Sequence, residues 1–372
     1  MGLSQPCIDE IAVSAYTIPT DAPEADGTLS WDSTTLVLAE IRAGDQVGRG
    51  YTYGSKAIAV VAEHLGKKCL TGQPALDTSR LYLAMLRQVR NNGSRGIASM
   101  AISALDIALW DLKARLLGCA VTVLLGASQS SVAAYGSGGF TSYSNAKLAK
   151  QLEGWVKSGI RSVKMKIGSH PESDPERVSV ARKTIGPDVA LFVDANGAFN
   201  AKRAIAMADR FSENGVSWFE EPVSSDRLAD MRRVRDAVRP EMEIAAGEYG
   251  YDSLYFRQML EAKAVDVLQL DATRCKGFTG FLEGAAVAAS FGCPVSAHCA
   301  PTLHAHIGSA VSNFRHVEYF HDHVRIEKML FDGFIEARNG KLQPDFSSLG
   351  LGLTFKRKDA ERYLAWGEGE AA

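Results

Sequence analysis

The sequence lacks the features that define several large classes of protein. It has 372 residues and a formal net charge of −2, so it has neither a polybasic surface for nucleic acid nor a strong field for acidic partners. No apolar run approaches the length of a membrane span, and residues 1–10 show neither the basic nor the apolar region of a secretory signal. These absences predict a cytoplasmic protein that binds neither nucleic acid nor membrane.

Cysteine and glycine motifs are missing as well. The six cysteines are scattered and form no CxxC pair, the usual spacing of a zinc or redox site. We therefore expect free thiols in a reducing compartment. No GxGxxG motif follows the first strand of the strand–helix region described below, which argues against a dinucleotide-binding fold.

What is present is the composition of an ordinary globular protein, 46% hydrophobic and 23% charged, on a chain long enough for one large domain and a smaller one. The first part of the chain, residues 1–126, has the pattern of an α+β unit. We expect strands at 11–18, 35–42 and 48–53, polar loops at 19–33 and 51–55, and helices at 56–65, 79–90 and 97–117.

From residue 127 to about 325, short apolar segments alternate with amphipathic ones. Eight strands and seven helices fit this stretch, and such alternation indicates a parallel sheet. Eight strands in about 200 residues suit a closed barrel better than an open sheet. Residues 326–372 are turn-like, and we expect them to leave the barrel and pack on the N-terminal unit.

Titratable residues end seven consecutive strands of the predicted barrel. In chain order they are Lys164 and Lys166, Asp194, Glu220, Glu248, Asp271, His298 and Glu318. One such residue is commonly a helix cap or a turn former. Seven in succession, at the edge where barrel enzymes carry their chemistry, predict an active site.

The two lysines lie in the strand Val163–Ile167. Because side chains alternate along a strand, Lys164 and Lys166 point to the same face. Two ammonium groups on one interior face are expected to lower each other's pKa, which would let one act as a proton-abstracting base. The alternative is a solvated edge strand with two surface lysines.

The acids divide into a metal-type group and a dyad. Asp194, Glu220 and Glu248 would repel one another unless a cation lay between them, and an oxygen-only set favours Mg²⁺, with Mn²⁺ as the alternative. Asp271 would fix the tautomer of His298 and raise its basicity. A metal between an amine and an imidazole suits removal of a proton next to a carboxylate.

This arrangement, with the lysines in a KxK motif and the acids within VDANG, WFEEP, AAGE, QLDA, SAHC and HVEY, resembles the enolase superfamily and its mandelate racemase subgroup. The resemblance covers nearly the whole chain. It implies a modified TIM barrel of the (β/α)7β type with an α+β capping domain that the C-terminal segment completes.

The resemblance also implies roles for individual residues. Lys166 matches the base, Lys164 a group near the substrate carboxylate, and Asp271 with His298 the catalytic dyad. Asp194, Glu220 and Glu248 match the metal ligands. Glu318 matches a hydrogen-bonding partner of the substrate carboxylate, Asn196 a residue that supports metal or substrate, and Glu221 a structural neighbour.

The chemistry so implied is abstraction of a proton α to a carboxylate, most strongly in the dehydration of an aldonate or aldarate to a 2-keto-3-deoxy sugar acid. Racemisation or epimerisation of a hydroxy acid and cycloisomerisation of a sugar-acid lactone stay open. The alternative hypothesis outside enzymes is a noncatalytic relative that binds an acid sugar and keeps the fold. The resemblance further suggests a homo-oligomer, either a dimer or an octamer.

Several other polar residues are set outside this predicted site. His304 and His306 are expected to be structural, and residues 321–323 to form a loop. We expect Arg274 and Lys276 to lie in a solvated loop, with a position that reaches the pocket as the alternative. From the resemblance, we expect Trp31, Tyr51 and Tyr53 to lie in loops that contact the far end of a substrate.

Overall fold

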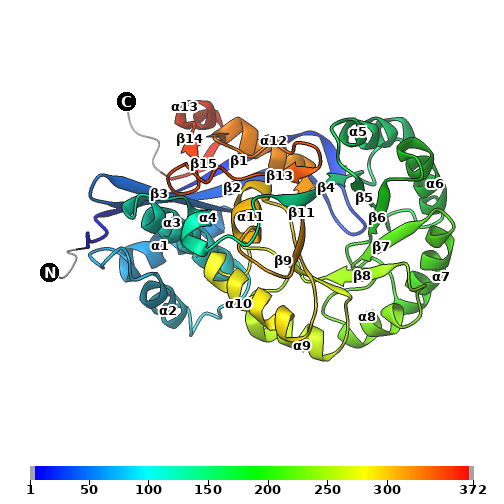
Figure 1. Ribbon diagram of the computed structural model, residues 1–372, viewed down its shortest axis with the longest axis horizontal. Helices are drawn as coiled ribbons and strands as arrows, with labels where there is room; N and C mark the ends of the chain where they lie inside the picture. The colour runs from blue at the N-terminus through cyan, green and yellow to red at the C-terminus, as the bar shows by residue number, and fades with distance from the viewer. Residues whose placement is uncertain (1–4, 368–372) are drawn as a thin grey trace.

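The structure is a computed structural model that describes residues 5–367. Figure 1 shows a barrel ringed by helices beside a smaller unit in which a sheet packs on helices. The barrel strands are β4 (Val132–Gly138), β5 (Ser162–Lys166), β6 (Ala190–Asp194), β7 (Val216–Glu220), β8 (Glu243–Ala246), β9 (Val267–Leu270), β10 (Val295–Ala297) and β11 (Phe314–Phe320). The helices between them are α5 (Asn145–Lys157), α6 (Asp174–Ile185), α7 (Ala201–Ser212), α8 (Leu228–Arg235), α9 (Ser253–Glu261), α10 (Gly277–Ser290) and α11 (Pro301–Gly308).

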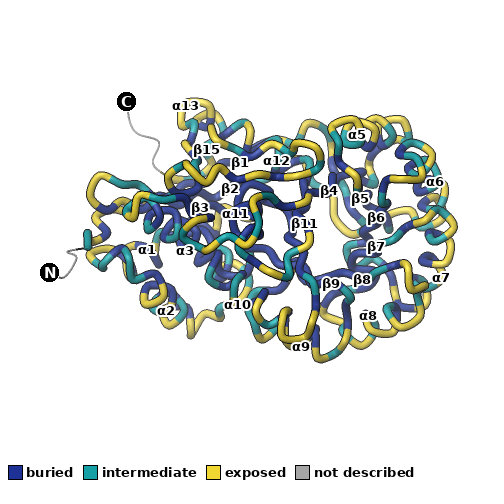
Figure 2. The backbone as a smooth tube through the Cα atoms, in the orientation of Figure 1, coloured by how far each residue is buried: buried dark blue, intermediate teal, exposed yellow. Residues whose placement is uncertain are grey.

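The eight strands are parallel neighbours in chain order, and β11 pairs with β4 to close the barrel. The predicted closed barrel is therefore confirmed. The sequence predicts four of its strands at 162–166, 190–194, 267–270 and 295–297, and these are the bounds observed. These strands are short apolar runs ended by glycine, proline or acidic residues, so their limits are legible in sequence. Figure 2 shows the barrel strands buried, while the surrounding helices are exposed on their outer faces.

Alternation along the strands explains why charge gathers at one end of the barrel. Phe192 and Trp218 pack with Tyr135 inside the barrel as an aromatic plug. Two residues further along the same strands, and therefore on the same inward face, come Asp194 and Glu220. The plug fills the bottom of the barrel, so the polar groups meet at its C-terminal mouth.

The capping unit is built from β1 (Glu10–Ala25), β2 (Ser30–Ala43) and β3 (Gln46–Tyr53) with α1 (Ala57–Cys69), α2 (Thr78–Gln88) and α3 (Ile97–Leu116). The loops predicted at 19–33 and 51–55 are largely wrong. The strands β1 and β2 stay paired out to Ala25 and Ser30, with a register shift between Pro19 and Glu24 that accommodates the prolines. Tyr51 and Tyr53 belong to β3. In Figure 1 the β1–β2 hairpin reaches from the cap towards the barrel.

The C-terminal residues contact both units. The helix α12 (His321–Leu330) follows β11 directly, so residues 321–323 begin a helix and the predicted loop there is wrong. Further along, β13 (Lys341–Leu342) pairs with β4 of the barrel, and β15 (Leu364–Trp366) pairs antiparallel with β1 of the cap. The division at residues 126 and 325 stays a prediction. Within the described residues no helix is long and apolar enough to cross a membrane.

Asp111 ties three segments of the cap together. Its buried carboxylate accepts hydrogen bonds from the backbone of Arg49 in β3 (2.7 Å) and of Leu351 in the C-terminal segment (2.6 Å), and it pairs with Arg115 at 2.9 Å. Removing one partner of a buried ion pair leaves the remaining polar groups unsatisfied. This carboxylate therefore holds α3, β3 and the C-terminal segment in register.

Asp111→Ala should therefore destabilise the protein by about 3 kcal/mol, because two backbone amides and the partly buried guanidinium of Arg115 lose their acceptor. Urea unfolding followed by circular dichroism measures the loss. Asp209→Ala removes an exposed carboxylate from α7 and serves as the control. Equal unfolding midpoints for the two variants would show that Asp111 does not contribute to the free energy of unfolding in this way.

Candidate active site

A cavity of about 370 Å³ lies at the C-terminal mouth of the barrel. The barrel contributes Lys166, Asn196, Glu248, Asp271, His298 and Glu318 to its walls. The cap contributes Asp26, Trp31, Ser33, Thr34, Thr35 and Tyr53. The predicted residues Lys164, Asp194 and Glu220 pack against these wall residues, with side chains that are fully buried. The structure thus brings every predicted site residue to one place.

Three buried carboxylates converge beside the cavity. Asp194, Glu220 and Glu248 each present an oxygen within 4.8 Å of the others. Trp218 Nε1 donates to Glu220 Oε2 at 2.9 Å, and the backbone of Asn196 donates to Asp194 Oδ1 at 2.9 Å, which orients both acids. Glu248 Oε2 is buried and has no hydrogen-bond partner in the described part of the chain. An oxygen-only set of this kind fits a hard divalent cation such as Mg²⁺.

The electrostatics of the trio depend on the two lysines. Burial and the nearby Asp194 raise the pKa of Glu220 well above its usual value. For Asp194 burial acts in the same direction, but Lys166 and Lys164 outweigh it and hold the pKa of that carboxyl at about 2. The cluster therefore holds more carboxylate than its own ammonium groups neutralise, which favours an added cation.

The lysines behave differently from the sequence expectation. Lys166 Nζ lies 2.5 Å from Asp194 Oδ2, and Lys164 Nζ contacts Glu220 and lies 2.7 Å from Glu318 Oε1. Burial would lower the pKa of each lysine, but the carboxylates outweigh both burial and the mutual repulsion, so both pKa values are raised. Lys164 does lower the pKa of Lys166, but the prediction that the lysine pKa values are lowered overall is wrong, because it did not count the facing acids.

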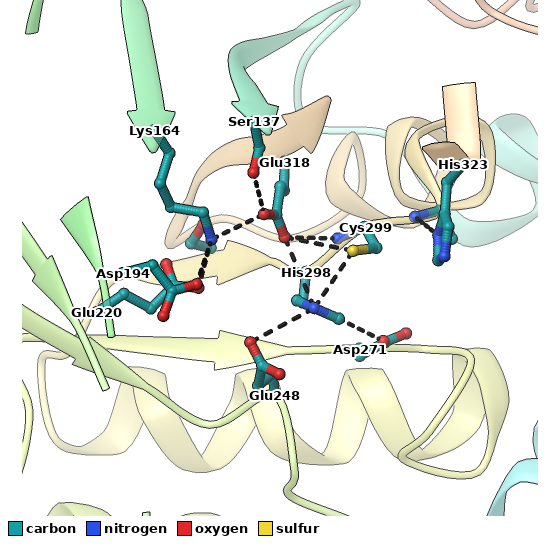
Figure 3. A network of polar contacts seen from close by, with 12 residues as sticks. Ser137, Lys164, Asp194, Glu220, Glu248, Asp271, His298, Cys299, Glu318 and His323 are labelled. Atoms are coloured by element: carbon teal, nitrogen blue, oxygen red, sulfur yellow. Dashed lines mark hydrogen bonds and ion pairs between the residues drawn. The ribbon is translucent and has the colours of Figure 1, made fainter. Parts of the chain in front are cut away.

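His298 and Asp271 form a hydrogen-bonded pair on another side of the cavity, as Figure 3 shows. His298 Nδ1 lies 2.8 Å from Asp271 Oδ2, while Asp271 Oδ1 accepts from the backbone and hydroxyl of Thr273, both at 2.7 Å. Burial would raise the pKa of Asp271, but the hydrogen bond and charge of His298 outweigh it and lower that pKa. An anionic Asp271 holds the proton on Nδ1 and leaves Nε2 as the reactive nitrogen.

Glu318 lies between Lys164 and His298 in Figure 3. Ser137 Oγ donates to its Oε1 at 2.5 Å, and the backbone N–H of Cys299 donates to its Oε2 at 3.1 Å. With Lys164 also on Oε1, both oxygens are held by donors from β4, β5 and the turn after β10. This anchoring fixes the Glu318 carboxylate in the wall of the cavity.

Two residues next to the trio adopt left-handed backbone conformations. Asn196 has φ 46° and Glu221 has φ 38°, an arrangement that costs energy for residues other than glycine. Asn196 Oδ1 and Glu221 Oε1 are buried without a hydrogen-bond partner among residues 5–367. Backbone strain and unsatisfied buried oxygens lower stability, and they are commonly found in binding and catalytic sites. Their presence at Asn196 and Glu221 supports a binding site here.

Arg274 and Lys276 were expected in a solvated loop, and that prediction is wrong. Arg274 lines the cavity, lies 3.3 Å from Glu248 Oε1 and stacks over Tyr249 at 4.9 Å. Lys276 is buried and donates to the backbone oxygen of Tyr251 at 2.7 Å. Sequence reasoning missed Arg274 because its partners come from a neighbouring strand. The position three residues after Asp271 was the available signal.

The cysteine after His298 was also missed. Cys299 Sγ lies 3.2 Å from His298 Nε2, inside the cavity. Cys299 and Ala300 both have positive φ, and this tight turn aims the Cys299 amide at Glu318. By contrast His304, expected to be structural, bonds the backbone of Ala272 and Cys299 away from the cavity.

The three aromatic residues expected over the barrel mouth have different positions. Trp31 and Tyr53 line the cavity, and the ring of Tyr53 stacks on His323 with centroids 3.5 Å apart. Tyr51 does not line it, because its hydroxyl donates to the buried carboxylate of Glu327 at 2.7 Å. The expectation for Tyr51 is therefore wrong: Tyr51 shares a face of β3 with Tyr53, but it lies two residues earlier in the strand, where its ring stacks on Phe331.

Comparison with known proteins agrees with this fold and site. Residues 12–126 match the family model "Mandelate racemase / muconate lactonizing enzyme, N-terminal domain", and residues 147–360 match "Enolase C-terminal domain-like". The chain therefore belongs to the mandelate racemase/muconate lactonizing enzyme family of the enolase superfamily, which confirms the resemblance seen in the sequence.

Individual relatives span two reaction types. The chain is 34% identical over 285 residues to a D-galactarolactone cycloisomerase of Agrobacterium fabrum, covering 75% of this chain and 74% of the relative. It is 31% identical over 342 residues to an arabinonate dehydratase of Saccharolobus solfataricus, covering 88% and 90%. Among solved structures, a mandelate racemase/muconate lactonizing enzyme-like protein from Rubrobacter xylanophilus superposes with a TM-score of 0.95 at 46% identity, covering 97% and 100%.

Magnesium occurs in related solved structures. An L-talarate dehydratase from Polaromonas sp. JS666, complexed with Mg and L-glucarate, superposes with a TM-score of 0.87 at 27% identity, covering 97% of this chain and 98% of that one. Magnesium and a small acid-sugar ligand are therefore established for structural relatives of this chain.

Proposed function

We propose that this protein removes the proton α to the carboxylate of an acid sugar and dehydrates the sugar to a 2-keto-3-deoxy acid. The observation that carries the proposal is the placement of Lys166 and His298 on the wall of one cavity beside the carboxylate trio. Lys166 ends β5 and His298 directly follows β10, and these two strands lie three positions apart in the closed barrel through β4 and β11. Two acid–base groups can then meet different faces of one substrate.

Each residue has a role in this proposal. Lys166 takes the α-proton on Nζ, and Lys164 and Glu318 orient the substrate carboxylate. His298, held by Asp271, delivers a proton from Nε2 to the departing β-hydroxyl. Asn196, with its unsatisfied amide oxygen, supports the substrate or the metal site. The close contact between Lys166 and Asp194 means that the ammonium must lose this partner before it can act as a base.

Asp194, Glu220 and Glu248 would hold one divalent ion, Mg²⁺ with Mn²⁺ as the alternative. When bound, such an ion supplies positive charge that stabilises the enolate formed from the substrate carboxylate and offsets the carboxylates that raise the lysine pKa values. The support is the convergence of three buried acids and the buried Glu248 Oε2, which accepts no hydrogen bond among the described atoms and lies 3.4 Å from His298 Nε2.

Dehydration is favoured over other uses of the same proton abstraction because the cap side of the cavity is rich in hydroxyl groups. Ser33, Thr34 and Thr35 line it beside Asp26, and these groups suit a polyol chain. The relative that is an arabinonate dehydratase agrees with this choice. Cycloisomerisation of a sugar-acid lactone is the second candidate, because the similarity to a D-galactarolactone cycloisomerase favours it.

Incubation of the protein with a library of aldonates, aldarates and their lactones in the presence of Mg²⁺ tests the proposal. Dehydration gives a 2-keto acid, which semicarbazide detects, and we expect this product from at least one open-chain acid. Conversion of lactones alone would support the cycloisomerase. Exchange of the α-hydrogen with solvent deuterium and no 2-keto product would support an epimerase.

Cellular location and assembly are proposed on more general grounds. All six cysteines are free, which agrees with a reducing, cytoplasmic setting. We also propose a homo-oligomer, a dimer or an octamer. Light scattering coupled to gel filtration measures the assembly, and a monomer at micromolar concentration would contradict it.

A further inference from the structure

A second group of metal-binding side chains lies outside the catalytic cavity, between the cap and the barrel. Asp21 and Glu24 come from β1, and His321 is the first residue of α12. Each presents a ligand atom within 4.8 Å of the others. His321 Nε2 lies 3.0 Å from Asp21 Oδ2, so the imidazole already contacts one of the acids. The group therefore joins two segments that are 300 residues apart in the chain.

Only one of the two carboxylate oxygens of the buried Glu24 receives a hydrogen bond within the described residues. Its side chain is fully buried; Trp31 Nε1 donates to Oε2 at 2.8 Å, but Oε1 has no hydrogen-bond partner anywhere in residues 5–367. Burial and the nearby Asp322 raise the pKa of Glu24 to about 8. A buried carboxylate oxygen without a donor costs free energy unless a proton or a cation satisfies it.

The surroundings add further unsatisfied oxygens. Asp322 Oδ2 and the hydroxyl of Tyr143 are buried without hydrogen-bond partners among the described atoms. Burial, followed by the charges of Glu24, Asp21 and Asp322, raises the pKa of Tyr143. Arg325 is the nearby cation. It binds Asp322 Oδ1 at 2.6 Å and the backbone oxygen of Pro19 at 2.6 Å. Within the described residues, Arg325 and His321 are the basic side chains that pair with the carboxylates of this group, while Lys147 lies over the Tyr143 ring at 3.7 Å.

We propose that Asp21, Glu24 and His321 bind a divalent transition-type cation of the Zn²⁺ class, at a site separate from the catalytic trio. One imidazole and two carboxylates suit Zn²⁺, whereas the oxygen-only trio suits Mg²⁺. Donor atoms around tetrahedral zinc lie about 3.4 Å apart, as bond lengths of about 2.1 Å require. Asp21 and His321 are partly solvent-exposed, at 46% and 26% of their side chains, so they can close on the ion and admit it from solvent.

The site has a direct connection to the catalytic cavity. Trp31, which donates to Glu24, lines that cavity and packs edge-on against Phe140 at the end of β4. Asp26 also lines it, two residues beyond Glu24 on the same hairpin. An ion held between Glu24 and His321 would fasten the β1–β2 hairpin to the barrel and so fix the wall that the cap contributes. The ion acts on the position of this wall and takes no part in the chemistry.

Zinc stoichiometry of the full-length protein tests the proposal. The protein is stripped with a chelator, dialysed against Zn²⁺ with a large excess of Mg²⁺ to compete at the trio, and analysed by mass spectrometry for bound metal. We expect one Zn²⁺ per chain that Mg²⁺ does not displace. His321→Ala should weaken this binding at least 100-fold and Asp21→Asn at least 10-fold, whereas His64→Ala, at an exposed histidine of α1, should not change it.

A second readout does not depend on activity. Bound Zn²⁺ should slow proteolysis within the β1–β2 hairpin of the wild-type protein and leave the proteolysis of Asp21→Asn unchanged. Because Asp21 is half exposed, Asp21→Asn should fold normally, and it therefore tests zinc binding even if His321→Ala does not fold. Unchanged zinc affinity in Asp21→Asn, or zinc that Mg²⁺ fully displaces from the wild-type protein, would overturn the proposal. Neither result bears on the proposed dehydration, because both leave Lys166, His298 and the trio intact.

Discussion

Lys166→Met should reduce turnover of the acid sugar by about 10²–10⁴-fold, the contribution expected of a positioned general base. The ammonium of Lys166 is buried and held at 2.5 Å from Asp194, at the edge of the cavity that would receive the substrate. Methionine keeps most of the volume and removes the basic nitrogen. In D₂O the variant should also fail to exchange the α-hydrogen, because no other group is proposed to reach that face of the substrate.

Binding separates this loss from misfolding. Calorimetry should show the substrate bound to Lys166→Met with an affinity within about tenfold of the wild type, because Lys164, Glu318 and the trio are unchanged. The matched control is Lys202→Met, at an exposed lysine of α7, which should retain wild-type turnover. Full activity in Lys166→Met would remove this residue from the chemistry and leave the noncatalytic reading of the chain open.

His298→Asn should stop formation of the 2-keto product by a similar factor but preserve exchange of the α-hydrogen with solvent. Asparagine keeps a donor towards Asp271 Oδ2 and loses the titratable nitrogen Nε2 that would protonate the leaving hydroxyl. Proton NMR in D₂O follows both events in one sample. The contrast with Lys166→Met assigns base and acid to the two residues separately.

The opposite pattern would reverse the roles. If His298→Asn loses α-hydrogen exchange while Lys166→Met keeps it, the imidazole is the base for this substrate. An epimerised product from the wild type, with each variant exchanging the α-hydrogen of only one of the two epimers, would indicate a racemase or epimerase that uses one group on each face. His64→Ala, at an exposed histidine, is the control and should retain both exchange and product formation.

The barrel and its ring of terminal residues could be predicted from the sequence because each strand is a short apolar run closed by one polar residue. Parallel strands carry their C-terminal ends to one edge, so Asp194, Glu220 and Glu248 had to be neighbours once the barrel was inferred. The alternation that places Phe192 and Asp194 on the same inward face of β6 can likewise be predicted from that strand alone. These features need only the pattern within single strands.

The features that were missed depend on contacts between distant segments. The raised pKa values of the lysines come from acids on β6, β7 and β11, and the position of Arg274 comes from Glu248 in the turn after β8. The hairpin of β1 and β2 continues through prolines because it lies against the barrel, where the backbone oxygen of Ala25 accepts from Thr141 at 2.8 Å. No single segment of sequence contains that information.

The central claim is that an acid sugar loses its α-proton next to a divalent ion that Asp194, Glu220 and Glu248 hold. The most direct measurement is the kinetic isotope effect on a substrate deuterated at C2, determined with Mg²⁺ and again after exhaustive chelation. The account predicts a primary isotope effect or, where product release limits the rate, product that has lost the C2 label, and it predicts no turnover without the metal. Turnover that retains the C2 deuterium, or that survives chelation undiminished, would contradict it.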